Sequence, residues 1–185
     1  KRNLQGLDKP ILDSLGIDKN KPEKQQRNQT GSPILEEGDI LLNTTLAETS
    51  DWQQVDLPVV STLRHFCIET LSSYTEDNQA CISEVDLLDD KGQPIDKTKW
   101  EVVYVSSEQA DKNLGIAENL FDGDISSFWH TDPATEPGQP HRIIVDIKEI
   151  YKISALRFKV RKGAFLSGKV KEINVYGRPQ FFLFH

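Results

Sequence analysis

The sequence predicts an all-β protein whose strands close into a jelly-roll β-sandwich. Short apolar segments recur from residue 39 onward, polar turns separate them, and no segment keeps a sustained helical period. Two segments, RHFCIETL and KEINVYG, alternate apolar and polar side chains, as strands with one dry face do. The number and spacing of these segments are typical of two packed sheets.

The chain divides into a polar extension and one domain. Residues 1–38 are rich in Lys, Gln, Asn and Pro, and the segment KNKPEKQQRNQTGSP has no apolar periodicity. We therefore predict a linker or surface extension over 1–38 and the β-sandwich over 39–185. The predicted strands of the sandwich are 40–46, 52–57, 64–71, 81–88, 101–106, 141–147, 153–160 and 170–176. One helical turn is expected around residues 115–120.

Composition restricts the partners. The chain has 185 residues, of which 37% are hydrophobic, and a formal charge of −7. This charge argues against nucleic acid, because binding a polyanion requires a basic surface or stripe. The first residues do not have the order of a signal peptide, so for an exported protein we expect that these are mature residues. Cys67 and Cys81 are too few for a zinc site, and either a disulfide or two buried thiols fits the sequence.

Three motifs carry a resemblance to a known family. They are AENLFDGDISSFWHT at 117–131, PHRIIVDI at 140–147, and ISALRFKVRKGAFLSGKVKEINVYG at 153–177. Together they resemble the galactose-binding-like, or F5/8 type C (discoidin), β-sandwich, and in particular the carbohydrate-binding modules of family 32. WEVVYVSSEQ, at 100–109, resembles the opening strand of that family.

The family's closing signature stands in an unusual place. The segment LRHFCIETLSSYTEDNQACISEVDLL, at 63–88, resembles this signature but precedes the opening strand. The domain is therefore circularly permuted, with DDKGQPIDKTK bridging the usual termini, or the chain holds the tail of one module and the head of another. We favour permutation, because half a sandwich would expose strand edges and an open core.

The resemblance implies a structural calcium ion beside the Asp-Gly loop, where hard oxygen ligands suit this cation. The implied ligands are the Asn119 carbonyl, the Asp122 and Asp124 side chains, the Ser127 hydroxyl, the Ser83 carbonyl and Glu84. The carboxylates would repel one another unless a cation neutralised them. The alternative is that Asp122 and Asp124 only set a turn and that Glu84 is a surface strand residue.

The resemblance also implies a ligand site at the loop tips. His130 and Arg161 match the histidine and arginine that grip sugar hydroxyls in sugar-binding relatives, and both side chains can make such hydrogen bonds. The aromatic platform of several relatives is replaced here by Pro133. Phe165 could take its place, as could Tyr74 or Tyr104. We expect Trp129 in the core and a structural role for His141.

The function that the resemblance implies is a noncatalytic carbohydrate-binding module of a secreted or cell-surface protein, with a periplasmic location also compatible. Its partner would be a galactose-type or related glycan, alongside other domains of a larger protein. One alternative is a discoidin-type adhesion or membrane-surface module that uses Phe165 and Leu166, although the charge of −7 argues against a membrane surface. Another is a structural module without a ligand. The sequence has no common catalytic motif, so an enzyme is not expected.

Overall fold

The computed structural model describes residues 31–75, 77–134, 138–161 and 168–185. Most of the predicted extension, residues 1–30, lies outside these ranges. Within them the chain is all-β and antiparallel, as predicted, and its helices are three short 3-10 segments. None of the helices in these ranges has the length and apolarity needed to cross a membrane.

The strands are β1 (Pro33–Ile34), β2 (Ile40–Thr45), β3 (Gln53–Thr70), β4 (Cys81–Ile82), β5 (Glu84–Asp89), β6 (Glu101–Val105), β7 (Trp129–His130), β8 (His141–Lys159), β9 (Glu172–Arg178) and β10 (Leu183–Phe184). The 3-10 segments are η1 (Glu37–Asp39), η2 (Asp111–Asn113) and η3 (Ala117–Phe121), the last at the predicted helical turn.

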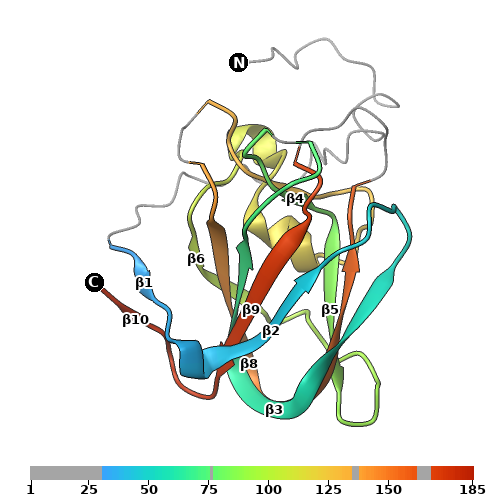
Figure 1. Cartoon of the computed structure of the whole chain (residues 1–185), viewed down its shortest axis with the longest axis vertical. Helices are drawn as coiled ribbons and strands as arrows, with labels where there is room; N and C mark the ends of the chain where they lie inside the picture. Colours follow the sequence, from blue (N-terminus) through green and yellow to red (C-terminus); the bar gives the residue numbers. More distant parts are fainter. Residues whose placement is uncertain (1–30, 76, 135–137, 162–167) are drawn as a thin grey trace.

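Two long strands, β3 and β8, replace four of the predicted strands. The prediction of separate strands at 52–57 and 64–71, and at 141–147 and 153–160, was wrong, because each pair is one continuous strand. The β3–β8 register shifts between Asp56 and Ser61 and again between Leu63 and His65. Such bulges bend a strand without ending it, so both strands curve at one end of the molecule (Figure 1).

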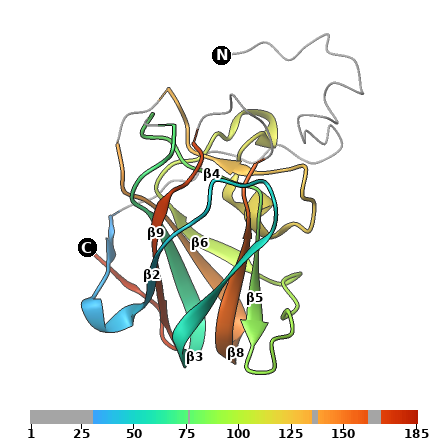
Figure 2. The ribbon, with the colours of Figure 1, turned by 45° about the vertical axis from the view of Figure 1, so that its right-hand side comes forward.

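The bent strands contribute to both layers of the sandwich. In the first layer the strands lie in the order β2-β9-β3-β8-β6, where β3 and β8 contribute residues 65–70 and 141–146. In the second layer the order is β3-β8-β5, where the same strands contribute residues 53–56 and 155–158. Figure 2 shows the layers more nearly edge-on. Segments from before and after residue 100 therefore build one sandwich, since β3 lies between β8 and β9.

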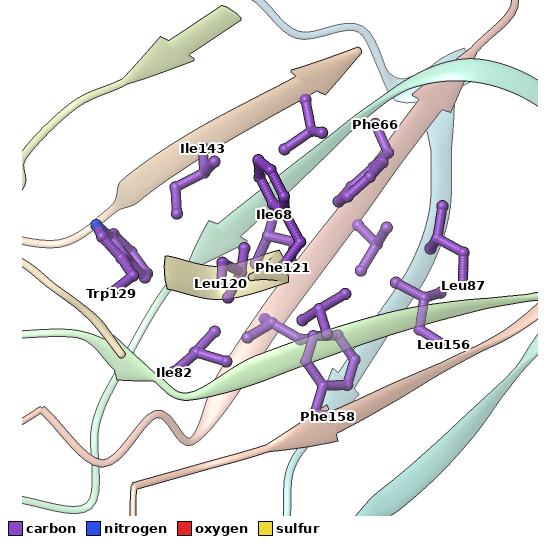
Figure 3. Close-up of a cluster of buried hydrophobic side chains, with 14 of the residues drawn as sticks. Phe66, Ile68, Ile82, Leu87, Leu120, Phe121, Trp129, Ile143, Leu156 and Phe158 are labelled. Atoms are coloured by element: carbon purple, nitrogen blue, oxygen red, sulfur yellow. The ribbon is translucent and has the colours of Figure 1, made fainter. Parts of the chain in front are cut away.

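The core lies between the layers, where large apolar side chains of both meet. Phe66 and Ile68 of β3 face Leu156 and Phe158 of β8, and Leu120 of η3 lies within the same cluster (Figure 3). All five are at most 1% exposed. Removing such a side chain from water contributes about 1.5–3 kcal/mol, so this core is the main stabilising element of the domain.

The outer face of the first layer carries a second, smaller apolar cluster. Cys67, Ile144, Tyr176 and Phe182 pack there, with Tyr104 at its edge. The β1–β10 ribbon lies on this side, where the rings of Tyr104 and Phe184 are 5.7 Å apart. Cys67 and Cys81 are both buried free thiols, which decides between the two alternatives that the sequence left open.

Candidate functional site

The β4–β7 ribbon joins the early and late segments at the loop end of the sandwich. Cys81 pairs with His130 and Ile82 with Trp129, and β4 lies at the end opposite the bend of β3 (Figure 1). The Thr131 backbone N–H donates to the Ala80 carbonyl at 3.0 Å, and the Thr131 hydroxyl accepts from the Ala80 N–H at 3.0 Å. His130 is thus held on two hydrogen-bonded segments.

His130 is buried beside its own chain. Its Nδ1 lies 2.5 Å from the Thr131 carbonyl oxygen, and because a carbonyl can only accept, Nδ1 carries the proton and Nε2 the lone pair. Burial lowers the pKa of His130, and the Arg161 cation lowers it further. A neutral imidazole at pH 7 follows. The Gly115 backbone approaches His130 closely, since a Cβ at Gly115 would lie 2.9 Å from the His130 Cβ.

Arg161, two residues after the end of β8, belongs to the same cluster. Its guanidinium carbon is 4.0 Å from the centroid of the Phe128 ring, a cation–π contact. The Phe128 and His130 rings form an edge-to-face pair, with centroids 6.4 Å apart. The Cys81 thiol lies in the same group, and burial raises its pKa to about 12 despite the opposing effect of Arg161. The structure therefore brings the two predicted sugar-binding side chains together on one aromatic support.

The platform residues have different outcomes. Phe165 falls outside the described residues. The Tyr74 hydroxyl donates to the Leu46 carbonyl at 2.7 Å, and its ring carries the Lys171 ammonium at 5.5 Å. Tyr104 packs against the outer-face cluster and not against the group of His130, Phe128 and Arg161, which is called the lip below. Among the three candidates, Tyr104 is thus ruled out as a platform.

The two residues expected to be structural are buried. Trp129 is fully buried, and its indole N–H donates to the Ser107 carbonyl at 2.9 Å. His141 is also buried, and its Nε2 lies 2.6 Å from the Asn78 carbonyl oxygen. Both predictions are confirmed.

The Asp-Gly loop is ordered by its own side chains. Asp122 Oδ1 accepts from the Asp124 N–H at 2.9 Å, and Asp122 Oδ2 accepts from the Ser127 hydroxyl at 2.5 Å. Asp124 Oδ1 accepts from both the N–H and the hydroxyl of Ser126. The Asn119 amide donates to the carbonyls of Asn113 and Phe128 and fixes the loop to the body. These contacts are those of a turn, which was the alternative to a metal site.

Glu84 meets this loop from the early segment. The Gly123 N–H donates to Glu84 Oε1 at 3.1 Å, although the two residues are 39 positions apart. The Lys97 ammonium donates to the same oxygen at 2.9 Å, to Asp86 Oδ1 at 2.5 Å and to the Val85 carbonyl at 3.1 Å. The pKa of Glu84 is raised to about 7. Burial is the main cause, and the Asp122 charge adds to it, while Lys97 has the opposite effect. Glu84 is a buried residue and not a surface residue.

The predicted metal ligands are only partly assembled. Within the described part of the chain, no three His, Cys, Asp or Glu side chains converge as a metal-holding group. Ser83 is buried next to Glu84, and its N–H donates to the Lys159 carbonyl. Two residues that donate to Glu84, Lys97 and Gly123, line an open hollow of about 410 Å³. Its lining residues are Lys97, Thr98, Glu118, Phe121, Asp122 and Gly123.

Sequence reasoning missed two contributors to these sites. Phe128 supports Arg161, and its signal was the aromatic directly before Trp129 in the motif. Lys97 lies in the polar segment DDKGQPIDKTK, which reads as a solvated bridge, and nothing in the sequence indicates that its ammonium reaches a buried carboxylate.

These features define a class of protein: an antiparallel β-sandwich with a polar cluster at its loop end. The comparisons with known proteins agree with this class. Residues 102–180 match the sequence model of the F5/8 type C domain family, the family that the motifs resemble. A sialidase of Micromonospora viridifaciens is 33% identical over 84 residues, which are 44% of this chain and 13% of the sialidase. The finer likeness to family 32 modules and the permuted order stay predictions.

Proposed function

We propose that this chain is a noncatalytic carbohydrate-binding module that holds a galactose-type or related glycan at the loop end of the sandwich. The observation that carries the proposal is the convergence of Arg161 and His130 on the Phe128 ring. Arg161 offers N–H donors, and the His130 imidazole lies beside it against the same ring. Such polar side chains on an aromatic support suit the hydroxyl groups of a sugar.

The module would work by tethering. Sites of this kind bind weakly, and they act by raising the local concentration of a linked domain on its glycan. The matched relative is a sialidase, and the aligned stretch is a small share of it, so a larger protein with further domains is part of the proposal. A secreted or cell-surface location follows from the glycan partner.

We also propose the permuted strand order. The family match begins at residue 102, yet β3 and β5, which precede it, supply central and flanking strands of the same sandwich. The contact between Glu84 and Gly123 supports this order, because it joins the counterpart of the closing signature to the Asp-Gly loop.

Calcium beside this loop is a further part of the proposal. The donor chemistry fits the ion: Glu84 Oε2 is buried and has no hydrogen-bond partner among the described residues, and Asp122, Asp124, Ser127 and the carbonyls of Ser83 and Asn119 could supply oxygens. Bound calcium would offset the buried negative charge of Glu84. It would also strengthen the connection between the segment that carries Glu84 and the Asp-Gly loop.

Glycan binding at the lip is tested on a glycan array with two arginine variants. Arg161→Ala should weaken binding at least about tenfold, since it removes the fork of donors. Arg157→Ala is the matched control: Arg157 lies four residues before Arg161, within β8, and also stacks on an aromatic ring, Trp52 at 4.7 Å, but in the second layer.

The array is read with and without chelator, and circular dichroism verifies that both variants fold. Unchanged glycan binding in Arg161→Ala would move the site elsewhere. Binding of anionic vesicles in place of glycans would favour the adhesion alternative.

A further inference from the structure

Lys97 occupies a position that a cation would take. Its ammonium contacts Glu84 Oε1, Asp86 Oδ1 and the Val85 carbonyl within 3.1 Å, so three oxygens already surround one positive charge. The Lys97 side chain is 18% exposed, whereas that of Glu84 is 2% exposed. The ion pair is therefore largely withdrawn from water on the side of the carboxylate.

Glu84 is only half satisfied by this arrangement. Oε1 accepts from the Lys97 ammonium and from the Gly123 N–H, while Oε2 is buried without a hydrogen-bond partner among the described residues. A buried carboxylate in this condition depends on a nearby positive charge, because burial of an unpaired charge is strongly unfavourable. In the described contacts of Glu84, Lys97 supplies that charge.

Solvent reaches the same place from the loop side. The open hollow is lined by Lys97 together with Asp122 and Gly123, the residue that donates to Glu84. A hydrated divalent cation entering the hollow would meet the Asp122 carboxylate and the Lys97 ammonium, which lies between the hollow's lining and Glu84 Oε1. Two cations close to one carboxylate repel each other, so each weakens the binding of the other.

We propose that Lys97 is the resident counter-ion of Glu84 and that calcium binds there in competition with its ammonium group. The inference rests on the calcium part of the proposed function and adds what controls it. Asp86, which the ammonium also contacts, can retain a displaced lysine, because its carboxylate is 15% exposed and does not line the hollow. Lys97 thus sets the calcium affinity of the loop, and the early and late segments stay joined without metal.

Calcium titration calorimetry on the full chain tests the competition. Lys97→Met should bind calcium at least about tenfold more tightly than the wild type, because the competing charge is gone. Lys148→Met is the matched control: Lys148 is also ion-paired, to Glu101 at 2.6 Å, but contacts neither Glu84 nor the hollow among the described contacts. Its calcium affinity should equal that of the wild type.

A second measurement needs no variant. Reductive methylation of the wild-type protein, followed by mass spectrometry, should modify Lys97 faster in millimolar calcium than in chelator, with Lys148 as internal reference. Equal calcium affinity of wild type and Lys97→Met, absence of binding to both, or an unchanged Lys97 methylation rate would each overturn the proposal. The proposal of glycan binding at the lip is tested separately, by the glycan binding of Arg161→Ala. Its outcome does not depend on the calcium measurements.

Discussion

Two glutamates are buried in this sandwich, and they are satisfied to different extents. Glu69, on the outer face of the first layer, uses both oxygens: Oε2 accepts from Arg142 Nε at 2.7 Å, and Oε1 accepts from the Asn174 amide and the Tyr176 hydroxyl. Glu84 uses one oxygen for Lys97 and Gly123, and its other oxygen has no partner among the described residues.

The difference separates a structural carboxylate from one that is open to a ligand. A buried polar group that is fully hydrogen-bonded rigidifies its surroundings and gains little from a further partner. A half-satisfied carboxylate carries an uncompensated desolvation cost, so any cation that reaches it gains free energy. The comparison predicts that Glu69 and Glu84 affect the unfolding free energy differently. The difference should appear when the pH changes, when the paired lysine or arginine is removed, and when the glutamate is replaced by glutamine.

The largest expected effect is on the pH dependence of stability. The pKa of Glu84 is about 7 in the folded chain and 4.5 in the unfolded chain, so the folded state binds the proton more tightly. The unfolding free energy should therefore decrease as pH rises from 4.5 to 7, by up to about 3 kcal/mol for this group. Urea unfolding of wild type and Glu84→Gln without calcium measures it, and parallel pH profiles of the two proteins would contradict the raised pKa.

The strand pattern was readable from the sequence, but the bends were not. Alternation in KEINVYG predicted β9, and the apolar segment at 40–46 predicted β2. The prediction ended one strand at residue 57 and began the next at residue 64, whereas β3 continues through residues 58–63 with bulges, because bulges follow from pairing with a distant strand.

The candidate sites show the same limit. Motif resemblance pointed to His130 and Arg161, and the structure places them together. The turn formed by Asp122 and Asp124 is local and was foreseen as an alternative. The contact of Lys97 with Glu84 depends on the fold and on the reach of a long side chain, and sequence separation conceals it.

The second effect concerns the partner of Glu69. Arg142→Met should destabilise the fold by about 2 kcal/mol, below the usual cost of breaking a buried pair because the Arg142 side chain is 30% exposed. Calcium should not restore this loss, because no cation can replace the directional Arg142 bond on that face. Urea unfolding with and without calcium measures it; recovery by calcium would remove the distinction between the two glutamates.

The smallest effect is the sharpest, because the two glutamates should respond with opposite sign. Glu69→Gln places an NH₂ group where only acceptors fit and should destabilise by about 1–2 kcal/mol. Glu84→Gln at pH 7 removes a half-satisfied buried charge while Lys97 keeps Asp86, and should stabilise by about 1 kcal/mol without calcium. Chelator-treated proteins, compared by urea unfolding, report both signs. An equal loss of unfolding free energy in the two variants would contradict this comparison. It would mean that Lys97 and Gly123 satisfy Glu84 as completely as Arg142, Asn174 and Tyr176 satisfy Glu69.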